Sequence, residues 1–381
     1  MMLDAGEKAA PAGPPTLPWP IIIVSFNRPE YLRRLCDSLR AQQRVRLNEA
    51  NIHLLQDGAQ SPRSGVQYAD PRDIEACIAV FRAAFPAGQV HAATDNLGIA
   101  MNMLRAERLA FQALRAPGAY FFEDDLELGP VYLAVMEQLR MRFRGHPKLG
   151  YFAAYGDHRR GSDRAAPRLV PLEHHWGFGL KRACWLAMQP WLRPFHQVYA
   201  EVDYQARPHL RIVELYGDRE VSSMSSSQDV AKTMACAELG FARVNTDVCY
   251  ARYIGEVGQS FRPATFEKLG YQAMRAETRM PDRPPPVTAE ALAAIAEAKR
   301  AACAAHRRER YEQELAEMRR TMFNPDRPAT REEVAWLWRL LMDRLPDEGV
   351  FEKMVGKRTV RQARRQLLRH REAQGKGGYL A

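Results

Sequence analysis

Residues 119–130 of the 381-residue chain read Ala-Tyr-Phe-Phe-Glu-Asp-Asp-Leu-Glu-Leu-Gly-Pro. The apolar, aromatic start is typical of a buried strand, and the Gly-Pro pair is typical of a chain break. Because side chains alternate along an extended backbone, we expect Glu123 and Asp125 on one side and Asp124 on the other. Adjacent carboxylates repel one another, and Mg²⁺ and Mn²⁺ take such oxygen ligands together with substrate phosphates. The stretch therefore favours a metal site, with a solvated acidic loop as the alternative.

The segments before this stretch alternate between short apolar strands and amphipathic helices. Strands are expected over 21–24, 52–55 and 89–92, and helices near 29–39, 74–85 and 100–114. This order indicates an α/β fold with a mostly parallel sheet covered by helices on both faces, in which ligands bind at the carboxyl ends of the strands. Polar residues follow all four expected strands: Ser25 to Arg28, Asp57, Asn96, and Glu123 to Asp125. The sequence therefore predicts a ligand site on this edge of the sheet.

The second half of the chain is expected to continue the α/β domain with less regular elements. Strands are expected at 151–155 and 168–170, and a helix from Asp229 to about Leu239 would end at Gly240. A Pro-rich break at 281–286 marks a domain boundary. We therefore expect four parts: a flexible leader (1–18), the α/β domain (19–280), a Pro-rich linker with a long helix (281–327), and a basic helical module (328–381).

Composition limits the class of protein. A hydrophobic content of 46% supports a real core, and no apolar run approaches the roughly 20 residues that span a bilayer. Residues 1–20 lack the basic-then-apolar order of a secretion signal. The six cysteines form no C-x-x-C pair, which suits reduced thiols and argues against zinc. We expect a cytoplasmic protein.

The formal charge of +10 is concentrated near the C-terminus. Between Lys353 and Lys376 there are nine Lys or Arg residues and one acid, Glu372, which is a net charge of +8. A nucleic-acid-binding protein would usually spread such charge over its main groove. The pattern instead favours contact between this module and the inner face of an anionic membrane, or an acidic polymer. A solvated helix face is the alternative.

Six short motifs occur in order over about the first 260 positions: Phe26-Asn27-Arg28, Gln56-Asp57, Asn96-Leu97-Gly98, Trp176-Gly177-Phe178-Gly179, Asp229 through Phe241, and Gly255-Glu256-Val257-Gly258. With these motifs, this part of the chain resembles a GT-A glycosyltransferase of the broad family 2 type. The acidic stretch at 123–127 looks most like that of the animal Golgi N-acetylglucosaminyltransferases. Residues 336–347 resemble the small helical domains that are appended to bacterial polysaccharide glycosyltransferases.

The resemblance implies a metal-dependent, inverting transfer from a nucleoside-diphosphate sugar, with a UDP-sugar favoured, to a hydroxyl of a glycan or polysaccharide acceptor. Mn²⁺ or Mg²⁺, held by Asp125, would neutralise the departing diphosphate. The implied donor-binding residues are Ser25, Asn27, Arg28, Asp57, Asn96, Gly98, Glu123 and Asp124. The implied acceptor-binding residues are Trp176, Gly177 and Phe178.

An acceptor hydroxyl is a poor nucleophile and needs a general base. The resemblance assigns this role to Asp229, whose charge a helix N-terminus would favour. A plain N-cap is the alternative for Asp229, and Asp203 is a competing base.

Simpler roles exist for other residues. Asp57, Asn96 and Gly98 could form turns, Arg28 could be a surface arginine, and Trp176 could belong to the core. His174 and His175 receive no ligand role, because two adjacent His residues cannot share one face of a strand.

Two rival functions are weighed. A nucleotidyltransferase usually has a Gly-rich phosphate loop after its first strand, and residues 25–29 contain no glycine. A catalytically inactive scaffold that binds glycan or nucleotide-sugar in a polysaccharide assembly would not need the carboxylates at 123–125 together with Asp229. Both observations favour the transferase.

Overall fold

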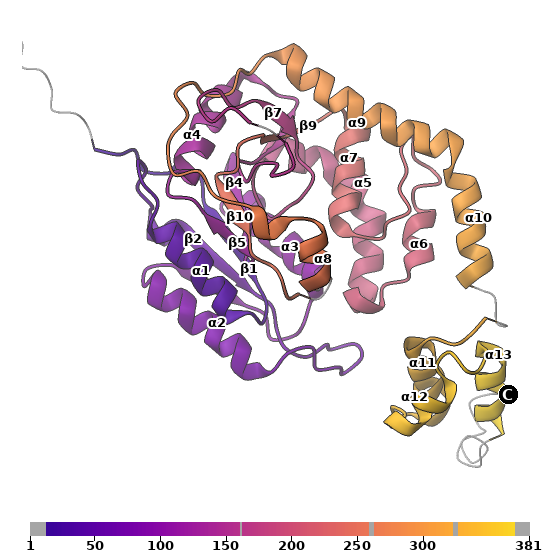
Figure 1. Ribbon diagram of the computed structural model, residues 1–381. Coiled ribbons are helices and arrows are strands. Elements are labelled where there is room, and N and C mark those ends of the chain that lie inside the picture. Colours follow the sequence, from indigo (N-terminus) through magenta and orange to yellow (C-terminus); the bar gives the residue numbers. More distant parts are fainter. Residues whose placement is uncertain (1–12, 161, 259–262, 323–326, 370–381) are drawn as a thin grey trace, which may run out of the picture. The chain divides into compact units, whose positions relative to one another are not determined.

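The computed structural model describes residues 13–160, 162–258, 263–322 and 327–369. The chain forms two compact units, 1–310 and 311–381. The expected architecture is confirmed, because a large, mostly parallel sheet lies between helices and further helices form the C-terminal part (Figure 1). Residues 1–12 of the expected leader lie outside the described residues.

The central sheet has eight strands in the order β3-β2-β1-β4-β8-β6-β9-β7. Their bounds are β1 (Ile21–Ser25), β2 (Ile52–Gln56), β3 (Gln89–Ala92), β4 (Gly118–Glu123), β6 (Leu149–Phe152), β7 (Leu169–Pro171), β8 (Gly177–Lys181) and β9 (Ala242–Thr246). Strands β1 to β4, β6 and β9 point the same way, whereas β7 and β8 run against them. The carboxyl ends of six strands therefore lie along one edge.

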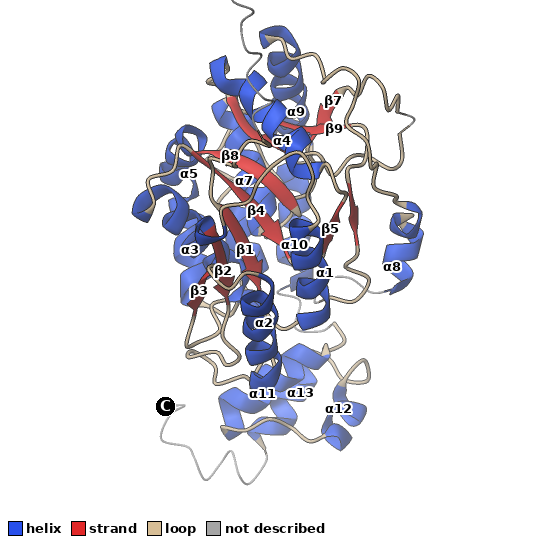
Figure 2. Cartoon of the chain, turned by 90° about the vertical axis from the view of Figure 1, so that its left-hand side faces the viewer, coloured by secondary structure: helices blue, strands red, loops and turns tan. Residues whose placement is uncertain are grey.

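Helices cover both faces of this sheet. Helices α1 (Pro29–Arg40) and α2 (Pro71–Ala84) pack together on one face, and α3 (Gly98–Arg108), α5 (Arg182–Glu201) and α7 (Gln228–Leu239) cover the other (Figure 2). All five residues of β1 are buried, as a β-branched run in a central strand of a doubly covered sheet should be. The remaining helices of this unit are α4 (Tyr132–Arg142), α6 (His209–Glu214), α8 (Pro263–Lys268) and α9 (Ala289–Glu309).

A second, two-stranded sheet was not expected from the sequence. β5 (Leu126–Leu128) pairs antiparallel with β10 (Ala251–Tyr253), and Leu126 lies opposite Tyr253. The backbone N–H of Ile254 also donates to the carbonyl of Asp125 at 2.8 Å. This pairing brings the segment from Tyr253 to Gly258 to the acidic end of β4.

The C-terminal unit consists of α10 (Tyr311–Met322), α11 (Arg331–Met342), α12 (Glu348–Met354) and α13 (Val360–Leu368). Thr330 and Glu333 form a capping box at the start of α11. The expected long helix is divided between α9 and α10, and the boundary between the units falls at 310, within that helical region. The part of the basic segment after Arg369 lies outside the described residues.

No described helix has both the length and the apolar character needed to cross a bilayer. All six cysteines are unpaired thiols, as expected from their spacing.

Candidate active site

The acidic residues after β4 meet Arg28, which follows β1. The Arg28 Nη2 atom donates to Asp124 Oδ1 and lies 3.1 Å from Asp125 Oδ2. The expected alternation of Asp124 and Asp125 is wrong, because the strand ends at Glu123 and the two aspartates form a turn. Both carboxylates therefore contact the same guanidinium.

The other oxygens of these carboxylates are candidates for metal binding. Asp124 Oδ2 and Asp125 Oδ1 are buried and have no hydrogen-bond partner within the described part of the chain. Such hard oxygen donors fit Mg²⁺ or Mn²⁺. No group of three or more His, Cys, Asp or Glu side chains in the described residues is arranged to hold a metal. A cation here would therefore need oxygens from another molecule, such as a diphosphate.

The electrostatics of the acidic group also favour a cation. Burial raises the pKa of Asp124 to about 6, although the nearby Arg28 opposes this effect. The pKa of Glu123 lies well above its ordinary value because of burial and the charges of Asp125, Asp229 and Asp124. One arginine thus faces three carboxyl groups, and a second positive charge would stabilise their ionised forms.

The segment after β10 lies close to Arg28. Val257 accepts a hydrogen bond from Arg28 Nη1 at 3.4 Å, and its N–H donates to Tyr31 Oη at 3.2 Å. A Cβ atom on Gly255 would overlap the Tyr253 hydroxyl and lie 2.9 Å from Asp125 Oδ2. Glycine is therefore required at position 255 for this close approach. The next four residues, 259–262, lie outside the described residues.

Asp57, Asn96 and Gly98 interact mainly with one another. Asp57 accepts from the N–H groups of Leu97 at 2.8 Å and Gly98 at 3.0 Å, and Asn96 Nδ2 donates to the carbonyl of Gly58 at 2.9 Å. Burial raises the pKa of Asp57 to about 6. These contacts fit the alternative of a local turn, and nucleotide binding by the three residues stays a prediction.

Ser25 and Asn27, which were predicted to bind the nucleotide-sugar, lie along the same edge of the sheet as Gly98. Ser25 is buried at the end of β1, and Asn27 is half-buried. Gly98 has φ +74°, and a Cβ there would lie 2.8 Å from the Tyr204 Cβ. The glycine thus allows the start of α3 to approach Tyr204, whose hydroxyl accepts from the N–H of Gln228 at 3.1 Å.

Asp229 lies in the first turn of α7 without capping it. The cap is Ser227, whose hydroxyl accepts from the N–H of Asp229, so the N-cap alternative for Asp229 is wrong. The Asp229 side chain is 40% exposed. Burial would raise the pKa of this carboxyl, but His175, Lys232 and Arg243 outweigh that effect and hold the pKa below its ordinary value.

His175 connects Asp229 to a buried arginine. His175 Nδ1 lies 3.3 Å from Asp229 Oδ1, and His175 Nε2 lies 3.1 Å from Arg243 Nη2. Arginine has only donors, so Nε2 must accept and the ring proton lies on Nδ1, facing Asp229. Burial lowers the pKa of His175 to about 4, so the ring is neutral at pH 7. The sequence did not indicate a role for His175 or Arg243, because only the tertiary structure brings Arg243 of β9 next to His175.

Asp203, the competing base, has a different environment. It accepts hydrogen bonds from Ser61, Ser64 and Tyr68, the last at 2.9 Å. Burial would raise its pKa, but these hydroxyl donors outweigh burial and lower it. Asp203 therefore anchors the loop at 59–68, and its carboxylate oxygens are already occupied. A catalytic role for Asp229 or for Asp203 stays a prediction.

The Gly-aromatic segment lies between these groups and the core. The Trp176 ring is stacked between His174 and Tyr253, with centroid distances of 4.2 Å on each side. Phe178 is buried and stacks on Phe121 at 5.4 Å, and Gly177 is buried beside it. With both faces covered, Trp176 fits the alternative of a core tryptophan, and acceptor contact by 176–178 stays a prediction.

No protein-family model matches the chain, and a comparison with curated proteins finds no match. Among solved structures, S. aureus TarS is similar to this chain, with 11% identity and a TM-score of 0.37. The match covers 89% of this chain and 50% of TarS, so the chain spans about half the length of that protein. S. aureus TarS 1–349 in complex with UDP gives 13% identity, a TM-score of 0.30, and coverage of 58% of this chain and 64% of the other. The galactosyltransferase LgtC with donor and acceptor sugar analogs gives 11% identity, a TM-score of 0.27, and coverage of 47% and 65%.

Proposed function

We propose that this chain is a glycosyltransferase that moves a sugar from a nucleoside-diphosphate sugar to a hydroxyl of a glycan acceptor. The observation that carries the proposal is a pair of buried oxygens on Asp124 and Asp125 that have no hydrogen-bond partner among the described residues. They lie on the same edge of the sheet as an ionised Asp229. Glu123 lies near both groups, because the pKa of its carboxyl is raised by burial and then by the charges of Asp125 and Asp229. In this proposal, one site would hold the donor diphosphate and also the base that acts on the acceptor hydroxyl.

Asp125, with Asp124, would hold a divalent cation, and that ion would stabilise the negative charge of the departing diphosphate. Arg28 offers a guanidinium at the same place and would bind the phosphate oxygens, because its planar donors match them. The segment at 255–258 contacts Arg28 and would limit access of water to the donor.

Asp229 would act as the general base of an inverting, single displacement. Oδ1 of Asp229 accepts a hydrogen bond from the Gln228 amide and lies 3.3 Å from His175 Nδ1. Oδ2 would then accept the proton of the acceptor hydroxyl. As that O–H bond breaks, the acceptor oxygen forms a bond to the anomeric carbon, and the bond between that carbon and the diphosphate oxygen breaks. The proton stays on Asp229 and the nucleoside diphosphate leaves.

The full-length protein should release UDP from at least one of UDP-glucose, UDP-galactose, UDP-N-acetylglucosamine and UDP-N-acetylgalactosamine when Mn²⁺ is present. EDTA and the Asp125→Ala variant should each abolish this release, whereas Asp218→Asn, which changes an exposed carboxylate, should leave it unchanged. An inactive scaffold would bind UDP in a thermal-shift assay without turnover. If the protein neither binds UDP nor hydrolyses any of these donors, the proposal fails.

We also propose that the C-terminal unit contacts anionic lipid. On α11, Trp336 is 52% and Leu340 is 75% exposed, one helical turn apart. Arg364 and Arg365 on α13 are exposed as well. Exposed aromatic and basic side chains are typical of interfacial binding. Vesicles that contain phosphatidylserine should sediment the protein, and Arg364→Glu/Arg365→Glu should reduce this binding at least about tenfold. Equal binding to neutral vesicles would contradict the idea.

A further inference from the structure

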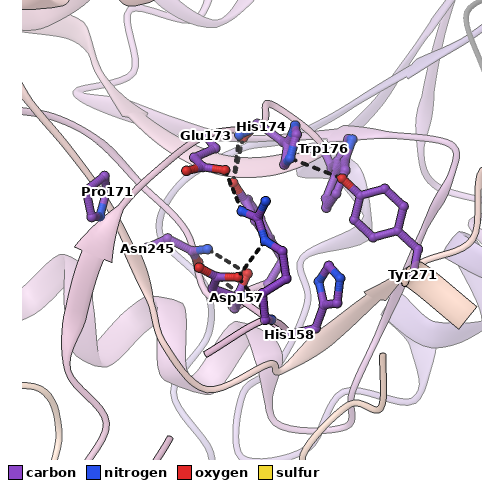
Figure 3. A pocket seen from close by; sticks show the side chains of 11 residues that line it. Asp157, His158, Pro171, Glu173, His174, Trp176, Asn245 and Tyr271 are labelled. Carbon is purple, nitrogen blue, oxygen red and sulfur yellow. Dashed lines mark hydrogen bonds and ion pairs between the residues drawn. The ribbon is translucent and has the colours of Figure 1, made fainter. Parts of the chain in front are cut away.

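The hollow at the carboxyl ends of β6 and β9 is closed by its own side chains (Figure 3). Arg159 forms ion pairs with Glu173 at 2.8 Å and with Asp157 at 3.3 Å. The Tyr271 hydroxyl lies 3.3 Å from His174 Nε2. The space that remains is about 20 Å³, which is close to the volume that a single water molecule needs. This hollow therefore leaves no room for a small organic ligand.

A larger groove lies between the end of α3 and the strands β2 and β3. Its volume is about 330 Å³, which is at the lower end of the range for small-molecule sites. None of the residues that line it takes part in the donor, acceptor or metal sites proposed above. The lining includes Leu55, His91, Arg105, Arg108, Leu109 and Ala113.

The wall of the groove that α3 forms has an irregular backbone. α3 ends at Arg108 and continues as one π-helical turn, Leu109–Ala113. Such turns are rare and are often found at functional sites. Within α3, Arg105 and Arg108 are three positions apart, so they are neighbours on the helix surface. Both side chains line the groove.

The strands hold Arg105 in place without using all of its donors. Its Nη2 atom donates to the carbonyls of Gln56 at 2.9 Å and His91 at 2.8 Å. Neither its Nη1 nor its buried Nε has a hydrogen-bond partner in the described part of the chain. A half-buried guanidinium with unsatisfied donors is stabilised by an added acceptor. Arg105 is therefore fixed in position with a donor left for a ligand.

The groove has an excess of positive charge. Among the described residues, no carboxylate forms an ion pair with Arg105 or with the exposed Arg108, and Glu107 between them is buried and pairs with Lys232 at 2.6 Å. Burial lowers the pKa of Arg105, and the charge of Asp57 offsets this effect only in part. Like charges on neighbouring positions of a helix repel each other. An anion in the groove would relieve this repulsion.

The number of guanidinium groups distinguishes a phosphate from a carboxylate. A guanidinium pairs with two oxygens of an anion, so one arginine is enough for a carboxylate. A phosphate monoester has three terminal oxygens and a charge of about −1.5 to −2 at pH 7, which matches two arginines. The side chains of Leu55 and Leu109 offer apolar contact to the carbon skeleton of such a ligand.

We infer that this groove binds a small organic phosphate, with its phosphate group on Arg105 and Arg108 and its carbon skeleton against Leu55 and Leu109. The inference goes beyond the proposed transfer reaction and does not depend on it, because the groove shares no residue with the proposed donor, acceptor and metal sites.

Isothermal titration of the full-length protein at a fixed ionic strength tests this inference. The probes are glucose 6-phosphate and glycerol 3-phosphate, and the comparison compounds are glucose, glycerol, glycerate and inorganic phosphate. At least one organic phosphate should bind more tightly than all four comparison compounds. Arg108→Gln should weaken that binding about tenfold, because it removes a charged hydrogen-bond partner. Arg108 is exposed, so its replacement should leave the melting temperature unchanged.

Arg82 provides the matched control. It is also an exposed arginine in the last turn of a helix, but that helix is α2, on the opposite face of the sheet. Arg82→Gln should leave phosphate binding unchanged. The inference is overturned if neither organic phosphate binds, if glycerate binds as tightly as glycerol 3-phosphate, or if Arg108→Gln and Arg82→Gln behave alike. Failure to bind UDP would instead refute the proposed function and would leave this result unaffected.

Discussion

His175 Nδ1 lies 3.3 Å from Asp229 Oδ1, although 54 positions separate the two residues in the chain. Arg243 occupies the other ring nitrogen and therefore places the proton on Nδ1. Among the described residues, Nδ1 has no hydrogen-bond partner, so its interaction with Asp229 is an electrostatic contact. His175 and Arg243 are both buried, so this arrangement is held by packing as well as by charge. Asp229 therefore remains ionised and oriented at neutral pH, which is what a general base requires.

Asp229→Asn should lower the transfer rate by about 10²–10⁴-fold, since an amide cannot accept the proton of the acceptor hydroxyl. The fold should persist, because Ser227 caps α7 and the Asp229 side chain is partly exposed. Steady-state transfer and the melting temperature measure the two effects. Near-normal transfer would mean that Asp229 is not the base, and Asp203 would then be the next candidate.

His175→Gln should move the acidic limb of the kcat/KM profile to higher pH. The pKa of Asp229 is lowered by His175, Lys232 and Arg243, so activity is present above that pKa and is lost as the pH falls through it. Without the His175 side chain, the pKa of Asp229 should rise, and activity should then be lost at a higher pH. The titratable groups that influence or face Asp229 are Glu123, His174, His175, Tyr199, Tyr204, Lys232 and Arg243.

His175→Asn is the matched comparison, because the Asn amide N–H lies near the former Nδ1 position and keeps a polar N–H group beside Asp229. Its profile should move less than that of His175→Gln. Identical profiles for both variants and the unmodified enzyme would show that His175 does not position the base.

Lys232→Met should lower the free energy of unfolding by about 3–5 kcal/mol. Lys232 Nζ lies 2.6 Å from Glu107 Oε1, and both side chains are almost completely buried. Removal of the lysine leaves a buried carboxylate whose remaining partner is Trp185 Nε1, at 3.1 Å. Urea denaturation measures the loss. The Glu107→Gln/Lys232→Met double variant should recover part of it, and a loss below about 1 kcal/mol would contradict the account.

Gly255→Ala should weaken UDP binding about tenfold, because overpacking costs about 1–3 kcal/mol and the new methyl group would press on Tyr253 and Asp125. Gly145→Ala is the control, since open space surrounds the Cβ position of that glycine. Isothermal titration of both variants with UDP and Mn²⁺ gives the comparison. Equal affinities would mean that the segment at 255–258 does not close on the donor site.

Local sequence patterns predicted much of this fold. β-branched runs such as Ile21 to Val24 indicated buried strands, and helical spacing after Pro29 indicated α1, because both periodicities are properties of short segments. The strand–helix order then placed the carboxyl ends at one edge, so Arg28 and the acids at 123–125 were expected together. Gly240 was recognised as the end of α7, and it has the left-handed φ of 71° that such a position favours.

Sequence alone indicated which chemical groups follow the first four strands, because the ends of strands can be located from local periodicity. Only the tertiary structure decided how those groups pair. In the tertiary structure, Arg28 contacts both Asp124 and Asp125, and β5 pairs with β10. Arg243 of β9 lies next to His175. Such pairings depend on which distant segments pack together. Because burial of an unpaired charge costs free energy, buried charged groups are found beside groups of opposite charge or beside hydrogen-bond partners.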